Sequence, residues 1–472
     1  MFGENTMDFR DISLEELVGN VKSKKISATE VTQAAIDNIE KLDHEINAFC
    51  STNHEDALAQ AESIDARIQN GEDVGKLAGI PIGVKDLEDA KGFVTAFGSE
   101  LHVNDAPAKE DSILVRRMRD EGCIVLGKTN TPEFGHKGKT DNGPFGATKN
   151  PWNLEFSPGG SSGGTSAALA SGMIPLGTGS DGGGSIRIPA ALGGLAGIKT
   201  SQGRIPIGGD TPPGSGLLTV KGPMANTTKD NALALDATVG PHPTDIFSLE
   251  GENLNWFSQL TGELPKSAIW SPTMGFSTVD KEVMEQCEIA INKLADAGVE
   301  IIEKETIWSE NPVEAWMVFW ASACARRQQH LIGTDDFEKI DPLLRLFIEM
   351  GTTMDGASYA ISVDSCHKLG FQLQQFFNES PLIITPATCG QAPKLEGDGF
   401  VNGEETPSWV DFTMGINMTR NPAGVIPISL LSSGLPASLQ IIGGQRKDID
   451  VLKAMYAFER VINFSERAQN HA

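Results

Sequence analysis

A serine preceded by three glycines is the residue best suited to chemistry in this sequence. The segment reads Asp181, Gly182, Gly183, Gly184, Ser185, Ile186 and Arg187. Glycines let consecutive backbone N–H groups turn toward one point, which is how main-chain amides form an oxyanion hole. The pattern predicts Ser185 as a nucleophile behind these N–H donors, with Asp181 and Arg187 pinning the turn. The alternative is a plain glycine turn with an incidental serine.

Ser185 needs a base, and no histidine lies near it in the sequence. The candidate is Lys85, which follows an alternating run at 79–84 that predicts a short buried strand. A lysine has a pKa of ~10.4 in water, and burial lowers that pKa. Taken alone, Lys85 is more typical of a surface lysine or of an ion pair with Asp86. It becomes a base only in combination with the serines.

Residues 160–164, Gly-Ser-Ser-Gly-Gly, match the G-x-S-x-G nucleophile elbow centred on Ser162. That elbow requires a strand directly before it and a later aspartate and histidine. Residues 153–158 end in a proline turn instead. Three of the downstream histidines, His330, His367 and His471, stand in no motif-like setting. A Ser-His-Asp triad centred on Ser162 is therefore not expected.

Residues 122–129 match the G-x-x-x-x-G-K-T spacing of a phosphate-binding loop. A true loop of this kind is flexible, follows a strand and opens into a helix. Here the residues between the two glycines are Cys, Ile, Val and Leu, which themselves predict a strand. Because a strand cannot wrap a phosphate, no nucleotide site is expected.

The bulk composition argues against several classes of protein. The net charge is −25 over 472 residues, and the Lys and Arg residues are scattered among the acids, unlike a nucleic-acid binder. No apolar run approaches the ~18 residues of a membrane helix, and no secretory signal is visible, so a cytoplasmic protein is predicted. The six cysteines are far apart and predict neither disulfides nor a metal site. No cofactor is expected.

Chemistry at these residues requires elements that bring them together. The first 75 residues read as helices, with possible capping boxes beginning at Ser13 and Ser27. Strands are predicted at 79–84, 123–126, 382–386, 427–430 and 438–442, and helices at 112–121, 280–297, 312–330 and from about 448. Strands interleaved with helices predict an α/β fold with a mixed sheet.

Several ordered motifs resemble the amidase signature family over nearly the whole chain. They are residues 79–86, 127–130, 145–146, 150–152, 159–164, 181–189, 197–199, 203–204, 222–224, 435–436 and 440–443. The resemblance implies an α/β fold with a large mixed β-sheet core covered by helices on both faces. It also accounts for the phosphate-loop match, since the family carries G-K-T-N at that strand end.

The resemblance implies a Ser-cisSer-Lys triad. Three residues would carry the reaction: Ser185 as nucleophile, Ser161 as bridging serine and Lys85 as base. The Gly160–Ser161 peptide would be cis, and the N–H groups of residues 182–185 would hold the oxyanion. Ser162 would support the relay by hydrogen bonding, and Gly135 would line the acyl site.

The chain is predicted to be one domain, residues 1–472. Its parts are an N-terminal helical layer (1–75), a signature core with the catalytic residues (76–235), a variable substrate-pocket region (236–420) and a C-terminal return to the core (421–472). Two departures from the family stand out. Gly182 replaces the usual Thr or Ile, which predicts a looser loop, and residues 423–427 are shifted relative to Ala-Gly-x-Pro-Ala. Residues 316–320 either wall the leaving-group site or form a core helix face.

The resemblance implies hydrolysis of carbon–nitrogen bonds in small or aryl amides through an acyl-enzyme, with esters and carbamates (urethanes) as possible further substrates. Aryl acylamidases, nylon-oligomer hydrolases and urethanases of the family are the expected relatives. The implied partner is a small-molecule substrate, with no nucleic acid and no membrane, and the chain would be a monomer or homodimer. The alternative is the glutaminase subunit of a tRNA-dependent amidotransferase, whose site should offer charged groups to the glutamine substrate.

Overall fold

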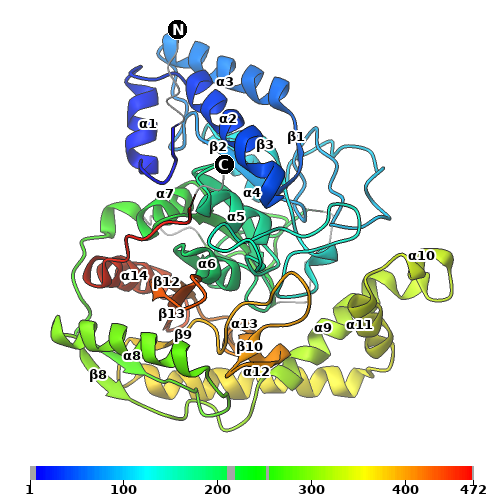
Figure 1. Ribbon diagram of the computed structural model, residues 1–472, viewed down its shortest axis with the longest axis vertical. Coiled ribbons are helices and arrows are strands. Elements are labelled where there is room, and N and C mark those ends of the chain that lie inside the picture. The colour runs from blue at the N-terminus through cyan, green and yellow to red at the C-terminus, as the bar shows by residue number, and fades with distance from the viewer. Residues whose placement is uncertain (1–6, 210–217, 251–254, 470–472) are drawn as a thin grey trace.

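The N-terminal segment is mostly helical. The computed structural model describes residues 7–209, 218–250 and 255–469. Three helices come first and lie together at one end of the molecule (Figure 1): α1 (Leu14–Lys22), α2 (Ala28–Ile46) and α3 (His54–Gln69). Ser13 and Ser27 cap α1 and α2, and Ser27 forms the full reciprocal box with Glu30. A short strand, β1 (Phe49–Thr52), was not predicted, because four residues are too few to show an alternating pattern.

The first sheet brings two strand ends together. Its order is β1-β3-β2-β4-β6, with β2 (Pro81–Lys85), β3 (Ile124–Thr129), β4 (Leu176–Asp181) and β6 (Val220–Ala225). Strand β2 is parallel to β3 and to β4, whereas β1 and β6 are antiparallel to their neighbours. Since parallel strands end at the same edge of a sheet, Lys85 lies near the residues that lead into Ser185.

The second sheet has the order β5-β12-β13-β9-β7-β8. Its strands are β5 (Gly197–Lys199), β7 (Ser267–Trp270), β8 (Glu300–Glu303), β9 (Leu382–Pro386), β12 (Ala423–Leu430) and β13 (Pro436–Gly443). Strands β12 and β13 form the predicted antiparallel hairpin, and β7 pairs in parallel with both β8 and β9. Because β5 packs beside β6 of the first sheet, the two mixed sheets share one hydrophobic core.

Helices pack against both sheets, which confirms the predicted α/β fold with a mixed-sheet core. They include α3, α5 (Gly163–Ala170), α6 (Arg187–Gly193), α7 (Thr228–Thr238), α8 (Lys281–Asp296) and α14 (Asp448–Ile462), whereas α4 (Ile113–Asp120) packs against α7. Every residue of α5 and α6 is buried, and the two helices contact each other in the middle of the molecule (Figure 1). These two helices begin shortly after Ser161 and Ser185.

The segment between β8 and β9 is helical and lies at the edge of the molecule (Figure 1). It contains α9 (Val313–Gln328), α10 (Asp335–Glu338), α11 (Pro342–Thr352) and α12 (Gly356–Phe377). Helix α9 packs against α11, α12 and the short α13 (Met414–Thr419), which precedes β12. Of the helices in the described ranges, none is both long and apolar enough to cross a membrane.

The phosphate-loop match at 122–129 is a strand, as predicted, because β3 covers most of it. The side chain of Lys128 is fully buried there. Its Nζ donates to the carbonyl oxygen of Glu88 (2.6 Å) and lies 3.4 Å from Asp86 Oδ1. Asp86 is therefore paired with Lys128, and the alternative in which Asp86 pairs with Lys85 is wrong.

Candidate active site

Lys85 ends β2 with its side chain inside the protein, 0% exposed. Its Nζ lies 2.7 Å from Ser161 Oγ, 2.8 Å from Ser162 Oγ and 3.0 Å from Ser180 Oγ. We call these four residues the lysine–serine cluster. Burial lowers the pKa of Lys85 to about 7, because the charged amine has lost its water. A substantial share of Lys85 is therefore uncharged near neutral pH.

The lysine–serine cluster has the hydrogen-bonding capacity of a proton relay. An ammonium donates to all three hydroxyls, whereas a neutral amine donates to two and accepts from the third. Within the described ranges no carboxylate stands at ion-pair distance from Lys85, so hydroxyl groups alone contact its amine. The amine can therefore change its protonation state without breaking a buried ion pair.

Ser161 and Ser162 follow a cis peptide, and the backbone of Ser162 contacts that of Ser185. A cis peptide joins Gly160 to Ser161, the form that the resemblance implied. The Ser162 N–H donates to the carbonyl oxygen of Ser185 (3.2 Å). Ser185 is partly exposed, whereas Lys85, Ser161 and Ser162 are buried. Of these four residues, Ser185 is therefore the one that a molecule from solvent can reach.

Ser180 is a member of the cluster that the sequence analysis missed. It lies on β4, two residues beyond Thr178, whose Oγ1 accepts a hydrogen bond from the Lys85 N–H (2.9 Å). Residues two apart on a strand share a face. The signal that could have found Ser180 is therefore a pair of hydroxyl residues, Thr178 and Ser180, on the strand that leads to the glycines.

Gly135 lies beside Ser161 and is the position that the resemblance associates with the acyl site. Its backbone has a φ of 72°, which favours glycine. A methyl group at this position would lie 3.1 Å from Ser161 Oγ and 2.8 Å from the side chain of Leu87. A side chain here would therefore crowd the bridging serine.

Asp181 and Arg187 hold the glycine loop from inside the protein. Both side chains are 0% exposed, and the guanidinium donates to both carboxylate oxygens, Nε to Oδ2 (2.9 Å) and Nη2 to Oδ1 (3.0 Å). Burial would raise the pKa of Asp181, but Arg187 holds it well below its usual range. This paired geometry is what a pinning role requires.

The N–H groups of the loop do not all face the substrate side. Gly184 donates its N–H to Asp181 Oδ1 (2.8 Å), so this donor is not available to an oxyanion, contrary to the expectation for residues 182–185. The reason is that the Asp181 carboxylate folds back under the loop. The N–H groups of Gly182, Gly183 and Ser185 have no hydrogen-bond partner in the described part of the chain. These three are the donors left for an oxyanion hole.

The four carbonyl groups of the loop are all hydrogen-bonded. Asp181 O accepts from Asn417 Nδ2 (2.8 Å), Gly182 O from Trp316 Nε1 (2.9 Å), Gly183 O from Thr413 Oγ1 (2.5 Å) and Gly184 O from the Ile188 N–H (2.7 Å). These four hydrogen bonds restrain the backbone of the loop, which is therefore less free to move than the glycine at position 182 predicted. Asn417 and Thr413 carried no sequence signal, since they lie 236 and 230 residues from their loop partners.

Helix α9 contributes Trp316 to this loop, and Trp316 is 6% exposed. A methyl group on Gly183 would lie 2.6 Å from its ring. Trp316 stacks on Trp320, with ring centroids 5.1 Å apart. Trp316 is therefore a buried helix residue that also lies against the loop before Ser185, and its role as a wall of the leaving-group site stays a prediction.

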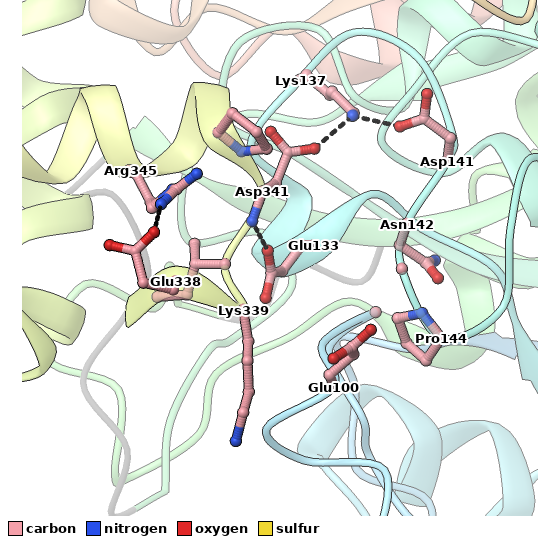
Figure 2. A pocket seen from close by; sticks show the side chains of 14 residues that line it. Glu100, Glu133, Lys137, Asp141, Asn142, Pro144, Glu338, Lys339, Asp341 and Arg345 are labelled. Atoms are coloured by element: carbon pink, nitrogen blue, oxygen red, sulfur yellow. Dashed lines mark hydrogen bonds and ion pairs between the residues drawn. The ribbon is translucent and has the colours of Figure 1, made fainter. Parts of the chain in front are cut away.

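A cavity of about 410 Å³ lies where the core meets α10 and α11 (Figure 2). On its wall Asp341 accepts from Lys137 Nζ (2.8 Å), and the Asp341 N–H donates to Glu133 Oε2 (2.7 Å). His136 Nε2 lies 3.2 Å from Asp341 Oδ1, at ion-pair distance but outside hydrogen-bond geometry. We call Glu133, His136, Lys137 and Asp341 the Asp341 clasp. It ties α11 to the loop that carries Gly135.

The histidines considered as triad members lie elsewhere. His330 and His367 are exposed, on the turn after α9 and on α12, and His471 lies outside the described residues. Across residues 7–209, 218–250 and 255–469, no group of three or more His, Cys, Asp or Glu side chains is arranged to hold a metal ion. The groups that meet at this site are lysine, serine and backbone groups.

Residues 30–452 match the family model of the amidases. Over 472 aligned positions the chain is 31% identical to an acylamidase of Rhodococcus erythropolis, covering 97% of this chain and 96% of that protein. It is also 30% identical to a glutamyl-tRNA(Gln) amidotransferase subunit of Agathobacter rectalis, covering 96% of this chain and 94% of that relative. The match therefore extends over nearly the whole length of both relatives.

Solved structures show the same likeness. A bacterial aryl acylamidase of the amidase signature family superposes with a TM-score of 0.89 at 30% identity, over 95% of this chain and 96% of that one. A 6-aminohexanoate cyclic dimer hydrolase superposes with a TM-score of 0.87 at 25% identity, over 98% of this chain and 99% of that one. The chain belongs to the amidase family, as its ordered motifs indicated.

Proposed function

We propose that this amidase hydrolyses the carbon–nitrogen bond of small or aryl amides through a Ser185 acyl-enzyme, with Ser161 and Lys85 as its proton relay. The observation that carries the proposal is the buried Lys85 amine, which lies 2.7 Å from Ser161 Oγ and has a pKa lowered to about 7. A lysine in this state can accept a proton at neutral pH. Ser185 is partly exposed, and its carbonyl oxygen accepts a hydrogen bond from the N–H of Ser162, which itself contacts Lys85.

The proposed reaction has two steps with one relay. Ser185 Oγ attacks the carbonyl carbon, and its proton passes through Ser161 to neutral Lys85. The oxyanion accepts hydrogen bonds from the N–H groups of Gly182, Gly183 and Ser185. The C–N bond then breaks, and the relay returns the proton to the departing amine. Water attacks the acyl ester by the same relay, which releases the carboxylic acid and restores the Ser185 hydroxyl.

Two observations support small or aryl amides as substrates. Trp316, which stacks on Trp320, presents its aromatic ring to the loop before Ser185. The relatives that match in sequence and structure include an acylamidase and an aryl acylamidase. Esters and carbamates present the same acyl carbonyl to Ser185, so we include them in the proposed range. The cytoplasmic location and the monomer or homodimer state remain predictions from the sequence.

The second candidate is the glutaminase subunit of a tRNA-dependent amidotransferase, and the likeness to several such subunits favours it. Such a site needs unpaired charges for the α-amino and carboxylate groups of glutamine. The charged residues nearest Gly135 are instead engaged with one another, since Lys137 is bonded to Asp341 and paired with Asp141. This pairing supports the stand-alone amidase over the glutaminase.

Hydrolysis of a nitroacetanilide, followed by the absorbance of the released nitroaniline, tests the proposal. We expect Ser185→Ala to abolish this activity while its melting temperature stays near that of the wild type. Ser171→Ala is the matched control, because Ser171 is a serine at the end of the buried helix α5 whose hydroxyl, within the described residues, bonds only to the Ala168 carbonyl oxygen. Activity above a few per cent in Ser185→Ala would reject Ser185 as the nucleophile.

The same assay separates the two candidate functions when the substrate is changed. A stand-alone amidase releases nitroaniline without any partner, and glutamine is a poor substrate. A glutaminase subunit would leave anilides, aliphatic amides, esters and carbamates untouched. It would release ammonia from glutamine only in the presence of its partner proteins.

A further inference from the structure

We propose that Trp316 is a positioning residue for the oxyanion hole, acting on the backbone of the loop through its indole N–H. This inference rests on the proposed function, because it concerns the same loop before Ser185. The contact in question joins Trp316 Nε1 to the Gly182 carbonyl oxygen at 2.9 Å. It reaches from α9, in the region that precedes β9, into the signature core.

The argument follows from the planarity of the peptide bond. In a trans peptide the carbonyl oxygen and the next N–H point in opposite directions. Holding Gly182 O on the side of α9 therefore directs the Gly183 N–H to the other side. Gly183 is one of the three residues whose N–H has no partner in the described ranges. A hydrogen bond from Trp316 thus determines where one oxyanion donor points.

The other two free donors are oriented by different parts of the protein. The Gly182 N–H shares its peptide with Asp181 O, which Asn417 holds. The Ser185 N–H shares its peptide with Gly184 O, which the first turn of α6 holds through the Ile188 N–H. Among the three donors, the Gly183 N–H is thus the one whose direction depends on α9.

Because residue 183 is a glycine, the peptide before it needs the hydrogen bond from Trp316 to keep its orientation. Gly183 has no side chain to restrict its rotation, and its open face is covered by the Trp316 ring at a distance that leaves no room for a methyl group. Thr413 Oγ1 holds the next carbonyl, Gly183 O, at 2.5 Å. Trp316 and Thr413 therefore restrain the two peptide planes on either side of Gly183.

Helix α9 also contains a matched comparison residue. Trp320 lies one turn along the helix and stacks on Trp316, but its Nε1 is buried with no hydrogen-bond partner in the described structure. Replacing either tryptophan by phenylalanine removes one indole N–H and keeps an aromatic ring. Only the change at Trp316 removes a hydrogen bond to the loop.

We expect Trp316→Phe to lower kcat on a nitroacetanilide by about 10- to 100-fold, below the loss seen when an oxyanion donor is deleted outright. KM should change by less than about threefold, because an aromatic ring is retained beside the loop. Trp320→Phe should keep kcat within about threefold of the wild type, since it removes no loop contact. Equal kcat values in the two variants, or a raised KM with kcat unchanged in Trp316→Phe, would overturn the proposal.

A trifluoromethyl ketone provides a readout that a merely structural role would not move. Its carbonyl carbon bonds to Ser185 Oγ, the serine proton passes to Lys85, and the resulting oxyanion occupies the hole. We expect Trp316→Phe to weaken this inhibitor by the same factor by which kcat falls. The binding of an unreactive product amine should stay unchanged. If both inhibitors weaken equally, Trp316 shapes the pocket rather than the oxyanion hole.

Replacement of Trp316 by benzothienylalanine provides an independent test should Trp316→Phe fail to fold, as its melting temperature would reveal. This residue keeps the two fused rings and has sulfur in place of the indole N–H that donates to Gly182 O, so kcat should fall as in Trp316→Phe. Unchanged kcat in this variant would count against the proposal. Ser185→Ala on the same substrate tests the proposed function separately from the role of Trp316. Residual activity in Ser185→Ala would reject the proposed function. If that variant is inactive, the comparison of the tryptophan variants decides whether Trp316 positions the oxyanion hole.

Discussion

Lys85 and Lys137 are both shielded from solvent, but they differ in the groups that they contact and in the direction in which their pKa is shifted. In the lysine–serine cluster, Lys85 contacts only hydroxyl groups, and burial lowers its pKa to about 7. In the Asp341 clasp, burial would lower the pKa of Lys137, but the carboxylates of Asp141 and Asp341 raise it above the usual value. In these two lysines the direction of the pKa shift follows the balance between burial, which lowers the pKa, and neighbouring carboxylates, which raise it.

The two clusters are also neighbours along one loop. Gly135 lies against Ser161, and the next residues, His136 and Lys137, belong to the clasp. The two lysines differ in their hydrogen-bond partners, since Lys85 is bonded to three hydroxyl groups and Lys137 to carboxylates. The comparison teaches that the proposed base has no carboxylate at ion-pair distance among the described residues, whereas Lys137 has two.

The largest expected effect comes from deleting each amine in turn. Lys85→Met should lower kcat/KM for a nitroacetanilide by about a thousandfold or more, because a positioned general base contributes ~10²–10⁴ and also activates the nucleophile. Lys137→Met removes a partly buried ion pair worth about 1 kcal/mol, so activity should fall by less than about tenfold. Circular dichroism checks folding of both variants. Similar losses of activity in the two variants would show that Lys85 and Lys137 do not differ in their roles.

The pH dependence of activity sharpens the same comparison. Lys85 acts as a base only when neutral, so kcat/KM should rise by about tenfold per pH unit below pH 7 and level off above it. The charge on Lys137 should leave this profile unchanged, since its pKa is raised and it stays protonated throughout. A bell-shaped profile centred near pH 6 would point instead to a histidine base.

The lowered pKa of Lys85 also affects stability, in a direction that can be measured separately. The unfolded chain keeps this proton up to pH ~10.4, whereas the folded protein releases it near pH 7. Because the unfolded state then binds more protons, this group makes the free energy of unfolding rise with pH between those values. Urea unfolding of the wild type and of Lys85→Met across that pH range checks this, and Lys85→Met should lack the contribution.

The smallest expected effect concerns the clasp itself. Burial would raise the pKa of Asp341, but His136 and Lys137 hold it well below its usual range. Its stabilising contribution is therefore present above pH ~3.9 and is lost as the pH falls through the lowered pKa. Asp341→Asn should reduce the free energy of unfolding at pH 7 by about 1–2 kcal/mol, between the values for exposed and buried pairs.

Asparagine still caps a helix, so Asp341→Asn keeps the cap on α11 and removes only the charge. Asp355→Asn makes the same change at the cap of α12, on the surface and away from the clasp, and should leave the melting temperature unchanged. Urea unfolding of both variants at pH 7 gives the difference. If the two behave alike, the Asp341 clasp contributes no more than an ordinary helix cap.

Much of the fold followed from local patterns. The hairpin of β12 and β13, the strand β9 and the helices α4, α8, α9 and α14 lie where periodicity and turn residues predicted them. The strands β1, β5, β7 and β8 have four residues or fewer and were not predicted, and neither were β4 and β6, whose glycines interrupt any alternating pattern. The phosphate-loop match that includes Lys128 was rejected because apolar residues predicted to form a strand stand between its two glycines. In the structure this segment is a strand, and Lys128 forms a buried ion pair with Asp86.

The sequence by itself determined that Ser161, Ser162 and the glycine loop stand in ordered motifs, and the family resemblance of those motifs joined them to Lys85. Ser180, the other hydroxyl residue bonded to Lys85, was found only in the structure. Only the tertiary structure decided which N–H groups remain free. Asp181 takes the Gly184 N–H, and Trp316 reaches Gly182 from 134 residues away. Contacts of that kind depend on the packing of distant elements, which leaves no periodic signal in the sequence.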